Sequence, residues 1–357
     1  MSSSLREGGT TVLNEFAQSE RVSRRLKLWS GFAIAGAAAV AALLLASPAS
    51  TQSQASGQAF AFSTGNPDGK MATASRPGPS SGANQETESA DDFVLSDQTA
   101  LTSASFTGLI PAAAGLGDVA QVRVEIYRVF PNDSDVGRTS GPPTFSTAQV
   151  PTRVNSPSDV ELVDRDSADA NLTFTTTLVA GSFMAANSVD AGIHPKPGQT
   201  TLGDGAVSGK EVRFEVTFTN PFELDPAFHY FFVPQVLLAD PNQHFLWLSA
   251  PRPIVAPGTR FNPDLQEWIR NANLDPDWLR VGTDIVGSGT FNTTFSLSGI
   301  ELPSCSGPAA GVAWKNHGEY VSSVARSVNP FLESGAISEE QADAIVESAA
   351  ESNCGKK

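Results

Sequence analysis

The chain contains 357 residues with a formal net charge of −15, and 40% of its residues are hydrophobic, among them 21 phenylalanines. This supply of apolar side chains can fill a core and excludes a disordered chain. Two cysteines exclude a disulfide-dense miniprotein. The acidic charge argues against a nucleic-acid partner, because phosphates repel carboxylates.

The first 49 residues carry the pattern of a signal peptide. Four basic residues within 21–27 precede a stretch from Leu28 to Ala46 that has no charge, and Ser47-Pro48-Ala49 offers small residues for cleavage. A retained membrane anchor is the alternative, because such a stretch just spans ~30 Å of hydrocarbon. Arg24-Arg25 leaves twin-arginine export open beside the general route. We expect an exported protein, extracellular, on the cell surface or periplasmic, with no membrane span after cleavage.

Residues 50–90 are rich in Ser, Gln, Gly, Ala and Pro and show no sustained period. This composition predicts a flexible linker, with the ordered region beginning near Asp91.

From Asp91 to about Gly299 the hydrophobic pattern alternates, as in Val212, Phe214 and Val216. Alternation indicates half-buried strands, and few helical stretches intervene, so the sheets should be antiparallel. We therefore predict an all-β fold over 91–302, a two-sheet antiparallel sandwich of jelly-roll type. The expected strands are 91–95, 101–109, 119–130, 171–179, 210–219, 228–239, 243–250, 278–286 and 290–299.

Local residue patterns in this region predict one hairpin and one helix. Strands 228–239 and 243–250 should form a hairpin through Asp240-Pro241-Asn242, although Pro234 conflicts with a central strand. Asn262 and Pro263 favour the start of a helix that continues over 264–271.

The C-terminal segment, 303–357, is expected to be a helical hairpin. Residues 309–328 and 338–352 have helical composition, and Ser338 with Gln341 forms a capping box. Cys305 precedes the first helix and Cys354 follows the second. Because export permits disulfides, we predict a Cys305–Cys354 bridge; two free thiols are the alternative.

Several stretches are similar to those of known exported proteins. ADDFVL (90–95), EIYRVFPNDSDVGRTSGPPTFSTAQVPTRVNSPSDV (125–160) and WLSAPRPI (247–254) resemble a family of exported bacterial β-sandwich proteins whose members often carry a C-terminal sorting signal. The tail over 313–355 resembles a short helical module of other exported bacterial proteins. The resemblance implies a fold and an exported location, and it implies no catalytic residues.

Calcium is the cofactor that the sequence favours. Asn132, Asp133 and Asp135 place oxygen ligands at close spacing before Gly137, and calcium prefers several such oxygens. A second acidic loop contains Asp164, Asp166 and Asp169. Solvated turns are the alternative for both loops, because Asp and Asn favour turns.

The sequence gives weaker support to a zinc site, a nucleophilic serine or a pair of catalytic carboxylates. The four histidines are scattered, and the expected hairpin would hold His229 and His244 several residue pairs apart, which argues against zinc. No G-x-S-x-G motif is present. Glu125 and Glu215 each lie beside an arginine, and a ladder of opposite charges on an outer strand face explains both.

Exposed aromatic rings could stack on a sugar, and the candidates are Trp247, Trp268 and Trp278; core packing is the alternative. We expect a non-catalytic surface, matrix or glycan-associated binding or structural protein. Its expected partner is an extracellular polysaccharide or an envelope component. A calcium-assisted polysaccharide-active enzyme is the alternative, and the sequence does not specify an oligomeric state.

Overall fold

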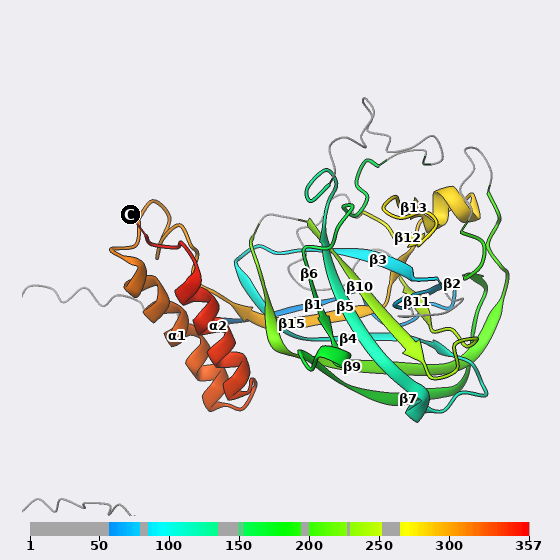
Figure 1. The fold of residues 1–357 in the computed structure, drawn as a ribbon, viewed down its shortest axis with the longest axis horizontal. Coiled ribbons are helices and arrows are strands. Elements are labelled where there is room, and N and C mark those ends of the chain that lie inside the picture. The colour runs from blue at the N-terminus through cyan, green and yellow to red at the C-terminus, as the bar shows by residue number, and fades with distance from the viewer. Residues whose placement is uncertain are drawn as a thin grey trace, which may run out of the picture. The chain divides into compact units, whose positions relative to one another are not determined.

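The computed structural model describes residues 57–78, 85–134, 150, 153–193, 200–226, 229–251 and 265–356. The predicted signal peptide at 1–49 lies outside them. Within the described ranges the fold is a sandwich of two sheets with a pair of C-terminal helices (Figure 1). This confirms the predicted all-β, two-sheet class.

The larger sheet has nine strands, and all its pairings are antiparallel except that of β2 with β8. Its strands are β1 (Gln58–Ser63), β2 (Met71–Ala74), β4 (Thr99–Ile110), β7 (Leu172–Ala185), β8 (Asn187–Val189), β9 (Val207–Leu224), β11 (Leu246–Ala250), β14 (Asn292–Thr293) and β15 (Phe295–Glu301). The smaller sheet has the order β13-β12-β3-β10-β5-β6. Its strands are β3 (Thr87–Val94), β5 (Val119–Arg128), β6 (Val163–Asp166), β10 (His229–Leu238), β12 (Trp268–Asn271) and β13 (Leu279–Arg280).

The core lies between the two sheets and follows the alternation in the sequence. On β9, Val212, Phe214 and Val216 are buried in it, whereas Arg213 and Glu215 point outward and are exposed. Phenylalanines dominate the contact, as in the stacked pairs Phe106–Phe214 and Phe232–Phe295. Burying both inner faces in one core fixes which side of each strand faces inward.

The structure corrects the expected linker and the expected helix. β1, β2 and the start of β3 lie within 57–90, so the sheets begin well before Asp91 and the described part of that range is not a linker. Residues 268–271 form strand β12 and not a helix, because they pair with β3 and bury Trp268. Asn262 and Pro263 lie outside the described residues.

β10 and β11 do not form the predicted hairpin. β10 pairs with β3 and β5 in the smaller sheet, whereas β11 pairs with β2, β4 and β14 in the larger one. The Asp240–Asn242 turn therefore carries the chain from one sheet to the other. Pro234 is tolerated because the pairing of β10 with β3 ends at Phe232.

The C-terminal helices confirm the predicted hairpin and disulfide. The helices are α1 (His317–Glu333) and α2 (Glu339–Glu351), and Ser338 with Gln341 forms the expected capping box. Cys305 and Cys354 are bonded to each other. The apolar faces of the helices pack on Ala100 and Ile300 of the larger sheet. No helix among the described residues is long and apolar enough to cross a membrane.

Candidate functional site

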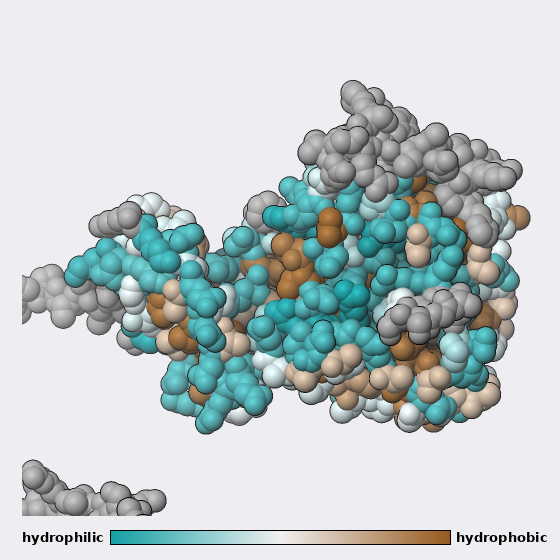
Figure 2. Space-filling view, in the orientation of Figure 1, coloured by the Kyte–Doolittle hydropathy of each residue, from teal (hydrophilic) through white to brown (hydrophobic). Residues whose placement is uncertain are grey.

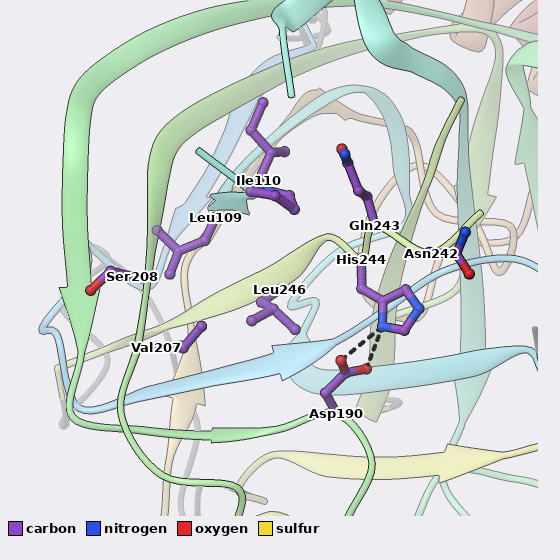
Figure 3. A pocket seen from close by; sticks show the side chains of 10 residues that line it. Leu109, Ile110, Asp190, Val207, Ser208, Asn242, Gln243, His244 and Leu246 are labelled. Atoms are coloured by element: carbon purple, nitrogen blue, oxygen red, sulfur yellow. Dashed lines mark hydrogen bonds and ion pairs between the residues drawn. The ribbon is translucent and has the colours of Figure 1, made fainter. Parts of the chain in front are cut away.

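An open pocket of about 300 Å³ lies where β4 ends, β9 begins and the chain enters β11 (Figure 3). Its lining combines aliphatic side chains with amide, imidazole and carboxylate groups. The lining residues are Leu109, Ile110, Pro111, Asp190, Val207, Ser208, Asn242, Gln243, His244 and Leu246.

His244 and Asp190 form the polar centre of this pocket. The imidazole Nδ1 lies 2.9 Å from Oδ1 and 2.7 Å from Oδ2 of Asp190 (Figure 3). Because a carboxylate only accepts, Nδ1 donates, and a neutral ring then presents Nε2 as an acceptor. Arg76 also donates to Asp190 Oδ1, at 3.1 Å. The carboxylate therefore fixes the orientation of the ring.

The charge of Asp190 is set by its neighbours. Burial by itself raises the pKa of this carboxyl, but the hydrogen bond and charge of His244, together with Arg76, lower it below its ordinary value. Asp190 is therefore ionised at neutral pH. The ion pair lies only partly buried, so solvent and ligands can reach it.

The backbone around the pocket is held by turns on both sides. The backbone N–H groups of Asp190 and Ala191 donate to Asp204 Oδ2 at 2.7 and 3.0 Å, which fixes the chain directly after β8. On the other side, Gln243 N–H donates to the Asp240 carbonyl, and the next residues enter β11. Local turns thus place His244 on the same side as Asp190.

The arrangement can bind a polar ligand that also has an apolar face. Pro111 and Val207 offer aliphatic contact from partly exposed positions beside the buried Leu109, Ile110 and Leu246. Asn242 and Gln243 add amide donors and acceptors. Ser208 lies on β9 across the pocket, and its hydroxyl points away from His244 (Figure 3). Ser208 therefore does not offer its hydroxyl to the imidazole.

Sequence reasoning missed this pocket. Asp190 and His244 are 54 residues apart, and Arg76 is a further 114 residues from Asp190. The sequence pattern relates His244 only to His229, at a distance of several residue pairs across a hairpin that does not form. Asp190 follows directly after a strand, but no specific sequence pattern marks that position as part of a site.

A second polar cluster is buried beneath the outer surface of the smaller sheet. Tyr127 Oη lies 2.8 Å from Glu88 Oε1 and 2.9 Å from Glu125 Oε2, and Arg270 donates to both Glu88 and Tyr127. Glu125 pairs with Arg123 at 2.9 Å, as the predicted ladder of opposite charges implies, but it is only 2% exposed and belongs to this buried cluster. Glu215 is exposed and pairs with Arg213 on its own strand.

The hydrogen count of this cluster assigns its charges. Tyr127 has one hydroxyl proton and two carboxyl neighbours, so one carboxyl must carry a proton of its own. Burial and then the charge of Glu88 raise the pKa of Glu125 well above its usual range, although Arg123 opposes them. For Glu88, burial is outweighed by the charge and hydrogen bonds of Arg270, which lower its pKa. Glu125 is thus the neutral member and Glu88 the ionised one.

The first predicted calcium loop is partly described. Asp133 accepts hydrogen bonds from the Arg128 guanidinium, so its charge is balanced within the protein. Asn132 donates its side-chain amide to the Val129 carbonyl. Asp135 lies outside the described residues, so the predicted loop site stays a prediction.

The three aspartates of the second acidic loop differ in their surroundings. Asp164 pairs with Arg123, and Asp166 accepts from the Ala168 N–H and from the Gln121 side chain. Asp169 lies in the short turn that follows β6. In the described ranges no group of three or more His, Cys, Asp or Glu side chains is arranged to hold a metal ion.

The three tryptophans are buried and lack the exposed ring face that sugar stacking needs. Trp247, Trp268 and Trp278 are 0, 1 and 0% exposed. Each indole N–H donates to a backbone carbonyl, of Thr294, Leu265 and Ser158 in turn. The predicted stacking role is therefore wrong, and these rings serve as core packing.

Comparisons with family models, with curated proteins and with solved structures find no match. The family resemblance in the sequence stays a prediction. Any function must therefore be argued from the geometry of the described residues themselves.

Proposed function

We propose that the protein is an exported, non-catalytic binding protein of the cell surface or extracellular matrix, which holds a sugar unit of a polysaccharide in the pocket around His244. The observation that carries this proposal is the paired His244–Asp190 centre beside an aliphatic wall. The Cys305–Cys354 disulfide supports the exported location, because such bonds persist in oxidising compartments.

The pocket suits the chemistry of a sugar ring. A pyranose has hydroxyl groups, which bond to carboxylate, imidazole and amide groups, and C–H faces, which pack on aliphatic carbon. Asp190, His244 and Asn242 supply the polar groups, and Pro111 and Val207 supply the aliphatic carbon. The volume of about 300 Å³ lies at the small end of the range for ligand pockets, which favours one ring of a longer chain.

Binding of defined oligosaccharides to the full chain tests this function. Calorimetry with gluco-, galacto- and amino-sugar oligomers should find one that binds, and His244→Ala should weaken that binding at least ~tenfold, about 1.4 kcal/mol. His229→Ala is the matched control, because His229 lies on β10 of the smaller sheet. This variant should bind as the wild type does. Equal binding by the His244→Ala variant would overturn the assignment of the pocket.

A polysaccharide-active enzyme is the second candidate, and the hydrogen-bonded His244–Asp190 pair favours it. An imidazole oriented by a carboxylate is a competent general base. Release of reducing ends from the bound polysaccharide, measured with calcium and with chelator, separates the two functions. Turnover that needs calcium and is lost in Asp133→Asn would support the enzyme and the first acidic loop. Binding without turnover would support the binding protein.

A further inference from the structure

Strand β7 has a free edge within the part of the chain that the structure describes. It pairs with β9 along one side only. Residues 172–189 contain no charged residue, no histidine and no proline. Exposed edge strands usually carry a lysine, a proline or another device that prevents pairing with a further strand. The absence of such residues makes β7 available for pairing.

The first half of β7 is regular and the second half is not. Leu172–Leu178 pairs residue by residue with 218–212 of β9, and register shifts follow Leu178 and Ala180. Bulges bend a strand and interrupt its ladder. Pairing with another strand is therefore confined to Leu172–Leu178, where Thr173, Thr175 and Thr177 are exposed.

This seven-residue segment is complementary to itself. Its sequence, LTFTTTL, is almost the same in both directions. If two copies pair antiparallel about Thr175, then Thr173 faces Thr177 and Leu172 faces Leu178 of the other copy. Threonine pairs and pairs of an aromatic with a β-branched residue are favourable across strands. The register would provide about six to eight backbone hydrogen bonds.

Charge also favours this edge as the contact between two copies. The chain carries a net charge of −15, so two molecules repel each other over most of their surfaces. Along the uncharged strand that repulsion is weakest. Leu178 and Val179 at its end are 47 and 53% exposed, and Figure 2 shows weakly polar and brown atoms along the rim where Figure 1 places β7. Pairing would cover this apolar surface.

We infer that two copies of this chain associate through Leu172–Leu178 of β7, antiparallel about Thr175, so that the larger sheets of the two molecules become continuous. The contact is isologous, because the same segment is used by both copies, and it closes after two molecules. It uses neither the His244 pocket nor the C-terminal hairpin.

The mass of the full chain as a function of concentration tests this inference. Sedimentation of the wild type should show a monomer–dimer equilibrium. Thr175→Lys places two ammonium groups opposite each other and should weaken the dimer at least ~tenfold. Thr217→Lys is the matched control, because it adds the same exposed charge to the neighbouring inner strand and should leave the dimer intact.

A cross-link tests the register without depending on the lysine variant. In an antiparallel pair, directly opposed residues have Cα atoms about 4.5 or 5.5 Å apart, a separation that a disulfide can bridge. Thr175→Cys should therefore form a covalent dimer under oxidising conditions, whereas Thr217→Cys should not. Rising salt should strengthen the association, because it screens the repulsion between acidic molecules.

Three results would overturn the inference. One is a wild type that stays monomeric at every concentration, which would leave the edge to a strand of a different protein. Another is a dimer that Thr175→Lys and Thr217→Lys weaken equally. The third is a dimer in which Thr175→Cys does not cross-link.

Discussion

The side-chain amide of Gln341 on α2 donates a 2.9 Å hydrogen bond to the backbone carbonyl of Phe218 on β9. The same amide donates to the Thr102 carbonyl at 3.1 Å, at the register shift of β4 that lies between Leu101 and Ser103. Its Oε1 meanwhile accepts from the Ser338 N–H, which closes the capping box. One residue therefore caps a helix and fastens the hairpin to the sandwich.

Gln341→Glu should separate these two roles. A glutamate can still cap α2, but it cannot donate to the two carbonyls and it places negative charge beside them. We expect a loss of about 1–3 kcal/mol in the free energy of unfolding, measured by denaturant titration. Glu340→Gln, at an exposed neighbouring position, is the control and should change stability little. A Gln341→Glu variant as stable as this control would show that the amide does not fasten the hairpin.

Removing the disulfide should destabilise the helical hairpin. The bond joins residues 49 apart, and in the loop-entropy model closing such a loop contributes about 4 kcal/mol. The double variant Cys305→Ala, Cys354→Ala should therefore unfold earlier in denaturant. Reductant should bring the wild type to the same midpoint and leave the variant unchanged. A variant that unfolds with the oxidised wild type would contradict this prediction.

The docking of the hairpin should weaken as pH rises from about 4.5 to about 7. Burial raises the pKa of Glu223 on β9 to about 7, although a hydrogen bond with Ser348 of α2 opposes the shift. Because the folded pKa lies above the unfolded value, the stabilisation is complete below about pH 4.5 and declines until about pH 7.

Glu223→Gln should remove this pH dependence, because glutamine stays neutral. The difference in melting temperature, variant minus wild type, should increase from pH 4.5 to 7 and then stay constant. Glu215→Gln, an exposed carboxylate on the same strand, is the control and should show no such trend. A Glu223→Gln difference that is flat across this range would refute the assignment.

The buried cluster around Tyr127 should respond unequally to two matched substitutions. Glu88→Gln removes the ionised partner of Arg270 and should cost about 3–5 kcal/mol of unfolding free energy. Glu125→Gln replaces a carboxyl that is already neutral and should cost much less. Equal losses in calorimetry would mean that the proton is not held by Glu125.

Local features of this protein could be predicted from the sequence. The alternation of β9, the capping box at Ser338 and the Cys305–Cys354 bond each follow from the order of a few residues. These features depend on side-chain period, on caps and on the redox compartment. All of them act over short stretches, or between two cysteines that have no other partner.

Other features were decided only by the tertiary structure. β10 and β11 join different sheets, residues 268–271 become a strand, and His244 pairs with Asp190. Glu125 and the three tryptophans are buried because segments distant in the sequence cover them. The physical reason is that sheet membership and side-chain partners are contacts between distant residues, which packing of the whole core selects and no local pattern specifies.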